Sequence, residues 1–159
     1  MSIGARLEGL LAALEQAAPI AALRESTYAF PLVNALHIIG IALLFGAIVA
    51  LDLRLLGWRH EAGEADRLRR LLVPVAMFGL LLAVPAGLAM FATDARGYAA
   101  SRLFQAKMLV VVLAAANALW LRRIDWRAPT ARFRLAVGGA ASILLWLTTI
   151  LLGRLVGYF

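Results

Sequence analysis

Polar side chains within long apolar stretches are the residues of this sequence whose types could do chemistry. The first apolar stretch, Phe30–Leu51, contains Asn34 and His37 and is followed at once by Asp52. At 100° per residue, Asn34 and Asp52 each lie about 60° from His37 around a helix, so the three predict one polar face that points into a helical bundle. Polar groups inside a membrane are energetically costly and usually functional, which makes this face the first place to look for a site.

A lysine at the start of the third apolar stretch is the second candidate. Only fourteen residues separate Lys107 from Arg122, and they span about 21 Å, which is too short for a ~30 Å hydrocarbon core. Either both cations extend to the membrane surface, or the helix begins near Ser101 and Lys107 lies inside. In the second case Lys107 lies about 9 Å from the helix end, the same depth that His37 has past Pro31.

These depths predict two polar layers in the bundle. The outer layer contains His37, Lys107 and Asn34, with Asp94 and Arg154 near its rim; the inner layer contains Asp52, Arg54 and Asn117. For the inner layer we expect a structural clamp, in which the carboxylate pairs with an arginine and the asparagine bonds across helices. For His37 two interpretations stay open, a cofactor ligand or a hydrogen bond to a neighbouring helix.

The elements that must position these residues are membrane-spanning helices. Hydrophobic residues make up 64% of the 159-residue chain, against roughly 45–50% in soluble domains. We predict an all-α, four-transmembrane-helix bundle in a single membrane domain, 1–159, because backbone polar groups in lipid must be satisfied internally. The predicted spans are about 30–53, 71–93, 102–122 and 134–156.

The N-terminal residues 1–18 predict an amphipathic helix rather than a span. Its leucines and Ile3 share one face, while Arg6, Glu8 and Glu15 lie on others. Such a helix fits flat on a membrane surface or against a partner subunit. Pro19 then ends it or starts a turn.

The net charge of +7 indicates membrane orientation rather than nucleic-acid binding, because the arginines lie in the loops between apolar stretches. Ten of the sixteen cationic residues flank the first and third loops, and six lie on the other side. The positive-inside rule then predicts that both termini of this multi-pass protein lie outside, which is the periplasm if the membrane is a bacterial inner membrane. The absence of cysteine excludes disulfides and thiolate metal sites.

The order of the polar residues resembles known membrane families. The stretch Ala35-Leu-His37-Ile-Ile-Gly40, followed by Leu44-Phe45-Gly46 and Asp52-Leu-Arg54-Leu-Leu-Gly57, is similar to an uncharacterised family of bacterial four-helix membrane proteins. It resembles more distantly the HemJ-type protoporphyrinogen oxidases and the CopD-like copper-resistance proteins. The HemJ pattern matches His37, Arg54-Leu55, Arg69-Arg70, Pro74 and Lys107, over roughly residues 30 to 120.

This resemblance implies haem binding through His37 and Lys107. A neutral imidazole is a common axial ligand, and a b-type haem fits between apolar helices. Lys107, Met90 or no residue would be the second axial ligand, and Asn34 lies beside the site. Arg102 or Arg154 would face the propionates. The sequence departs from the HemJ pattern at Asp52 and at Asn117, where no late histidine occurs, so it leaves open whether the protein is an enzyme.

Two other hypotheses belong to different functional classes. One is a cofactor-free accessory or anchor subunit of a larger membrane complex, or a homo-oligomer, suggested by the small size and by the small residues on helix faces. The other is copper handling of the CopD-like kind, which with one intramembrane histidine would need methionines or a second chain.

Overall fold

The structure, a computed structural model, describes residues 3–57, 64–126 and 128–158, except for the side chains of 64–66 and 129. The described residues form helices and no strand, which confirms the predicted all-α class. In chain order the elements are α1 (Ile3–Gln16), α2 (Ala18–Glu25), α3 (Ala29–Leu55), α4 (Glu64–Thr93), α5 (Ala95–Ala100), α6 (Arg102–Arg122), a 3-10 helix η1 (Pro129–Ala131) and α7 (Arg132–Val156).

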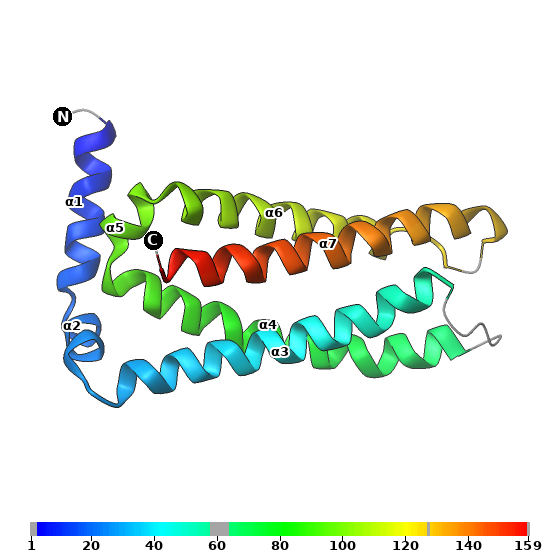
Figure 1. The fold of residues 1–159 in the computed structure, drawn as a ribbon, viewed down its shortest axis with the longest axis horizontal. Helices are drawn as coiled ribbons and strands as arrows, with labels where there is room; N and C mark the ends of the chain where they lie inside the picture. Colours follow the sequence, from blue (N-terminus) through cyan, green and yellow to red (C-terminus); the bar gives the residue numbers. More distant parts are fainter. Residues whose placement is uncertain (1–2, 58–63, 127, 159) are drawn as a thin grey trace.

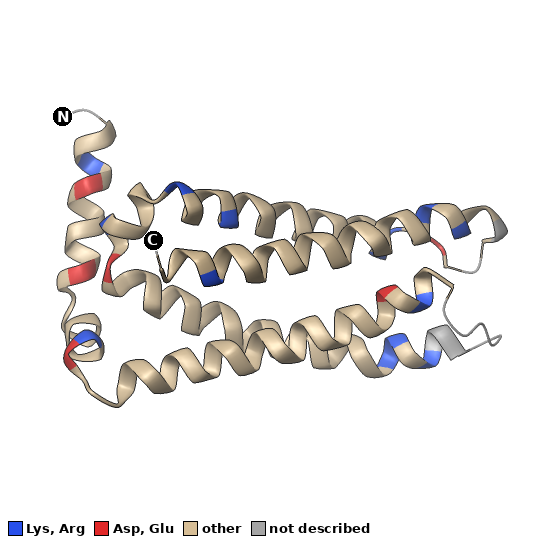
Figure 2. Ribbon diagram, in the orientation of Figure 1, with Lys and Arg blue, Asp and Glu red and all other residues tan. Residues whose placement is uncertain are grey.

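Four of these helices are long and apolar enough to cross a membrane: Ala29–Leu55, Arg67–Thr93, Arg102–Arg122 and Arg132–Val156. They run side by side, and the middle of each carries no charged residue while Lys and Arg gather toward the ends (Figure 2). Large apolar side chains are exposed along all four helices, as expected for surfaces that face lipid tails. The chain is therefore a multi-pass membrane protein.

The spans pack as two hairpins (Figure 1). Helix α3 packs along α4, α6 packs along α7, and the two pairs meet mainly where α3 contacts α7. The backbone of α4 lies farther from the second hairpin, but the Phe91 ring on α4 stacks on the Phe104 ring of α6 with the ring centroids 5.3 Å apart. Below, the terminal end is the end of the spans that carries α1, α2, α5 and the C-terminus, and the loop end is the opposite one.

Glycine allows the closest approach in the first hairpin. A Cβ atom built on Gly79 would lie 2.5 Å from the backbone nitrogen of Leu44 and 2.6 Å from the carbonyl oxygen of Gly40. One built on Gly40 would lie 2.6 Å from the nitrogen of Ala83. Backbones touch here with no room for side chains, as small residues in spanning helices allow and as the sequence spacing predicts.

The loop end contains a small apolar core. Leu121, Ile124, Ala131 and Leu135 are buried together, and Leu55 and Trp126 pack against them. The guanidinium of Arg69 on α4 lies 5.2 Å from the centre of the Trp126 ring, so a cation–π contact also joins α4 to the α6–α7 connection.

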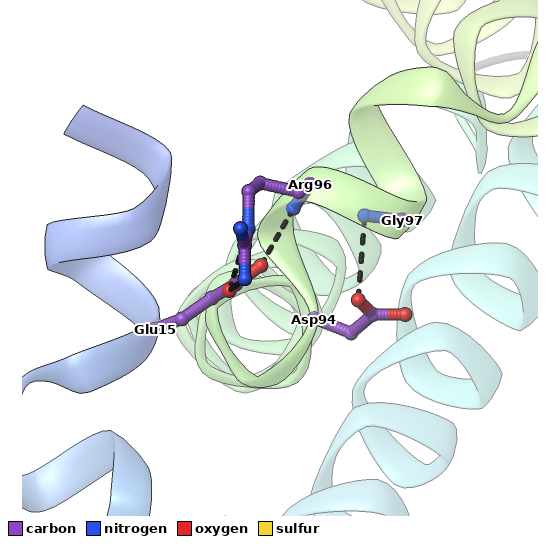
Figure 3. Close-up of polar contacts among 4 residues, drawn as sticks. All are labelled: Glu15, Asp94, Arg96 and Gly97. Atoms are coloured by element: carbon purple, nitrogen blue, oxygen red, sulfur yellow. Dashed lines mark hydrogen bonds and ion pairs between the residues drawn. The ribbon is translucent and has the colours of Figure 1, made fainter. Parts of the chain in front are cut away.

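Helix α1 lies across the terminal end, roughly perpendicular to the spans (Figure 1). It ends at Gln16, and Pro19 then opens the separate helix α2. Glu15 attaches α1 to the start of α5: one carboxylate oxygen accepts the backbone N–H of Arg96 at 2.8 Å, and the other accepts its Nε–H at 2.9 Å (Figure 3). These hydrogen bonds and the Arg96 charge lower the pKa of Glu15, which is only 6% exposed.

Candidate functional site

His37 lies in the third turn of α3 and makes a hydrogen bond to the neighbouring helix. Its Nδ1 is 2.7 Å from the carbonyl oxygen of Ala83 on α4. A carbonyl oxygen can only accept, so Nδ1 carries the hydrogen and donates it. In the neutral ring the other nitrogen, Nε2, then keeps its lone pair, and Nε2 is the atom available to a ligand.

Gly87 makes room for the imidazole ring. A Cβ atom at Gly87 would lie 2.9 Å from Cε1 and 3.2 Å from Nδ1 of His37. Ala83 and Gly87 are one turn apart on α4, so one supplies the hydrogen-bond acceptor and the other the space beside the ring. The two contacts fix both the position and the tautomer of His37.

Lys107 lies within the membrane-spanning part of α6. The helix begins at Arg102, after Ser101 accepts the Phe104 N–H with its hydroxyl, so Lys107 occupies the second turn. Its half-buried side chain lies along α7, with Nζ 3.5 Å from where a Cβ of Gly153 would be. Its ammonium group interacts electrostatically with the His37 imidazole. Within the described chain no ion pair or hydrogen bond holds that ammonium.

The other residues predicted for the outer layer have surroundings of their own. Asn34 is exposed rather than turned into the bundle, because the terminal end of α3 is packed on α4 and not enclosed by α6. Met90 is half-buried and lies three residues beyond Gly87, on the same side of α4. Arg154 is exposed, and its Nη2 donates to the Tyr158 hydroxyl at 2.6 Å. Asp94 accepts the Gly97 N–H and caps α5; His60 lies outside the described residues.

The inner residues do not form one cluster. Asp52 is buried between α3 and α7 and receives a hydrogen bond from Ser142. Asn117 instead bonds across the second hairpin, where its Nδ2 donates to the Gly138 carbonyl oxygen at 3.0 Å. Arg54 is half-buried two residues beyond Asp52, and residues two apart on a helix do not face each other.

Sequence reasoning did not identify three of the contacts. It did not find Ser142 as the hydrogen-bond partner of Asp52, Gly87 as the space beside the His37 ring, or the ion pair between Glu15 and Arg96. The small-residue spacing of Gly79, Ala83 and Gly87 was a usable signal for the second of these. Small residues at this spacing indicate a close contact between two helices, and the packing of an imidazole ring against a glycine is one such contact.

The described residues contain no group of three or more His, Cys, Asp or Glu side chains placed to hold a metal ion. Comparisons with known proteins add no assignment: no protein-family model matches the sequence, and no curated protein or solved structure matches it either.

Proposed function

We propose that this protein binds haem b within the membrane and that Nε2 of His37 is an axial ligand to the iron. The observation that carries the proposal is the hydrogen bond from Nδ1 to the Ala83 carbonyl. Histidines that ligate metals almost always donate their other ring N–H to a carbonyl, a carboxylate or water, which orients the ring and makes the ligating nitrogen more basic.

The residues around His37 fit such a group. Lys107 supplies a cation with no hydrogen bond or ion pair among the described residues, suited to a propionate or, when deprotonated, to the sixth coordination position. Met90 is the other candidate for that position, and Arg154 at the exposed end of α7 suits a propionate. A bound haem would supply one-electron redox chemistry, and the protein's residues would hold and orient it.

In this proposal the protein lies in a bacterial inner membrane with the terminal end on the periplasmic side. The greater number of arginines around the first and third loops supports that orientation. Helix α1 then lies in the outer interface, since Ile3 and Leu10 are 88% and 69% exposed and the helix is perpendicular to the spans (Figure 1).

The test is an absorption spectrum of the protein purified in mild detergent from haem-replete cells, oxidised and dithionite-reduced. We expect a stoichiometric Soret band that shifts on reduction and is lost in His37→Gly. Free imidazole added to His37→Gly should restore the band, because the variant leaves a space of the lost ring's shape. His60→Ala, which changes the chain's other histidine, is the matched control and should keep the band.

A colourless wild type that elutes as a single folded species would overturn the haem proposal. The hydrogen bond to Ala83 would then be the whole role of His37, and an accessory subunit without a cofactor would become the leading function. Measurement of the copper content of the same sample tests the CopD-like alternative.

A further inference from the structure

Asp52 is a buried acidic side chain inside a membrane-spanning helix. Its residue is 4% exposed, three positions before α3 ends at Leu55. Helix α7 covers it: a Cβ atom at Gly139 would lie 3.1 Å from the Asp52 carbonyl oxygen and 3.6 Å from its Cα. The glycine thus allows α7 to approach α3 closely enough to enclose the carboxyl group.

The carboxyl group has fewer partners than an ionised one needs. Ser142 donates one hydrogen bond to it, whereas Oδ2 is buried and has no hydrogen-bond partner among the described residues. The α7 residues that face it, Gly139 and Ser142, carry no charge. Arg54 lies two residues further along α3 and points to another side of that helix.

A buried carboxylate with one hydrogen bond is costly in a spanning helix, whereas a neutral carboxylic acid needs far less compensation. We propose that Asp52 is an exchangeable proton-binding site, held as a neutral carboxylic acid between α3 and α7. The ligand of this site is a proton. The proposal does not depend on haem binding, because the Asp52 position is fifteen residues, about 22 Å along α3, from His37.

Asp52 lies close to the end of its helix, where its proton can exchange with water. The end of α3 at Leu55 is only about 4.5 Å away along the helix, so water at the loop end is near.

Infrared spectroscopy of the protein in lipid at neutral pH tests the proposal directly. We expect the carbonyl stretch of a protonated carboxylic acid, separate from the carboxylate bands. It should disappear in Asp52→Asn and shift to lower frequency when H₂O is replaced by D₂O. In Ser142→Ala the band should move to higher frequency, because one hydrogen bond to the carboxyl group is lost.

If Asp52→Asn does not fold, isotope labelling and variants of the other aspartates can assign the infrared band to Asp52. Carbon-13 in the aspartate carboxyl groups should shift the wild-type band, and the band should persist in Asp66→Asn, Asp94→Asn and Asp125→Asn, which change the three other aspartates. Carboxylate bands alone, with or without a response to Na⁺, would overturn the proposal. So would an acid band that another aspartate variant removes, or one that does not respond to D₂O.

Discussion

At the scale of single residues, the proposed site depends on the His37 imidazole, whose two nitrogens have different environments. Nδ1 of His37 is bonded to a backbone carbonyl, and the ring lies against a glycine. Both contacts come from α4, whereas the nearby cation, Lys107, comes from α6. The binding properties that we propose should therefore respond to changes on three different helices.

Gly87→Ala tests the space beside the ring. The new methyl group would lie 2.9 Å from Cε1 of His37, so the ring must shift and the hydrogen bond to Ala83 weakens. We expect a loss of about 0.5–1.5 kcal/mol in the free energy of unfolding, together with an altered or weakened Soret band. Thermal unfolding in detergent and the absorption spectrum measure the two effects.

Gly46→Ala is the control for that substitution. It changes a glycine on α3 whose Cβ would have no atom within 4 Å. Alanine is the better helix former, so Gly46→Ala should unfold at the same temperature as the wild type or higher. An unchanged spectrum and stability in Gly87→Ala would contradict the assigned position of the His37 ring.

Lys107→Arg separates the two roles that we propose for the lysine. Arginine keeps the positive charge but cannot lose its proton to become an iron ligand. If Lys107 is a charge partner, Lys107→Arg keeps the spectrum and Lys107→Leu lowers haem retention several-fold. If Lys107 ligates the iron, both substitutions remove the amine ligand and both move the absorption maxima.

His37, Lys107 and Asp52 could be selected from the sequence because each is a polar residue in an apolar stretch. The partner of Asp52 could not be predicted. Ser142 lies ninety residues away, and the rotation of α7 against α3 decides which α7 side chain faces the carboxyl group. Asn34 shows the same limit: helical periodicity places it near the side of His37, but α6 does not cover that end of α3.

At the scale of helices, contacts between backbones hold the first hairpin together. Gly79→Ala would place a methyl group 2.5 Å from a backbone nitrogen of α3, and backbone cannot move aside as a side chain can. We expect the two helices to separate and the free energy of unfolding to fall by about 1–3 kcal/mol. Thermal or detergent-induced unfolding measures this; a value equal to that of Gly46→Ala would contradict the close contact.

The ion pair of Glu15 with Arg96 fastens α1 to the spans. Because the folded-state pKa of Glu15 is lowered, its contribution to stability is fully present above the ordinary value of 4.5 and is lost as the pH falls through the folded pKa. Glu15→Gln should remove the contribution at neutral pH. We expect amide hydrogen exchange in residues 3–16 to rise several-fold, with little change in the spans.

Glu25→Gln is the matched control, because Glu25 is exposed on α2 and ends that helix. Exchange in residues 3–16 should be unchanged in this variant. Equal exchange in Glu15→Gln and wild type would show that the ion pair does not hold α1 in place.

The spans themselves could be predicted, because the length of an uninterrupted apolar stretch is enough to specify a membrane-spanning helix. The start of the third span could be predicted near Ser101, because a helix that began at Lys107 would be too short to cross a membrane. In the structure Ser101 caps this helix. Which helices touch could not be predicted from loop length. Short loops predict antiparallel neighbours, but they do not predict that α3 rather than α4 packs along α7.

At the scale of the whole molecule, the proposed orientation can be tested with cysteine, since the natural chain contains none. Thr27 at the terminal end and Thr130 at the loop end are both exposed and make a matched pair. With periplasmic termini, a membrane-impermeant maleimide added to intact cells should label Thr27→Cys and not Thr130→Cys. The reverse pattern would place the termini in the cytoplasm.

The arrangement as two hairpins also bears on how the protein is made. Each hairpin consists of neighbouring helices, so α3 and α4 have their main packing partners before α6 leaves the ribosome. The second hairpin then has to dock on the first mainly through the surface of α7 against α3, on which the enclosure of Asp52 depends. Biogenesis would proceed in two insertion events followed by one docking step, and a variant that weakens the docking would accumulate as an inserted but half-assembled chain.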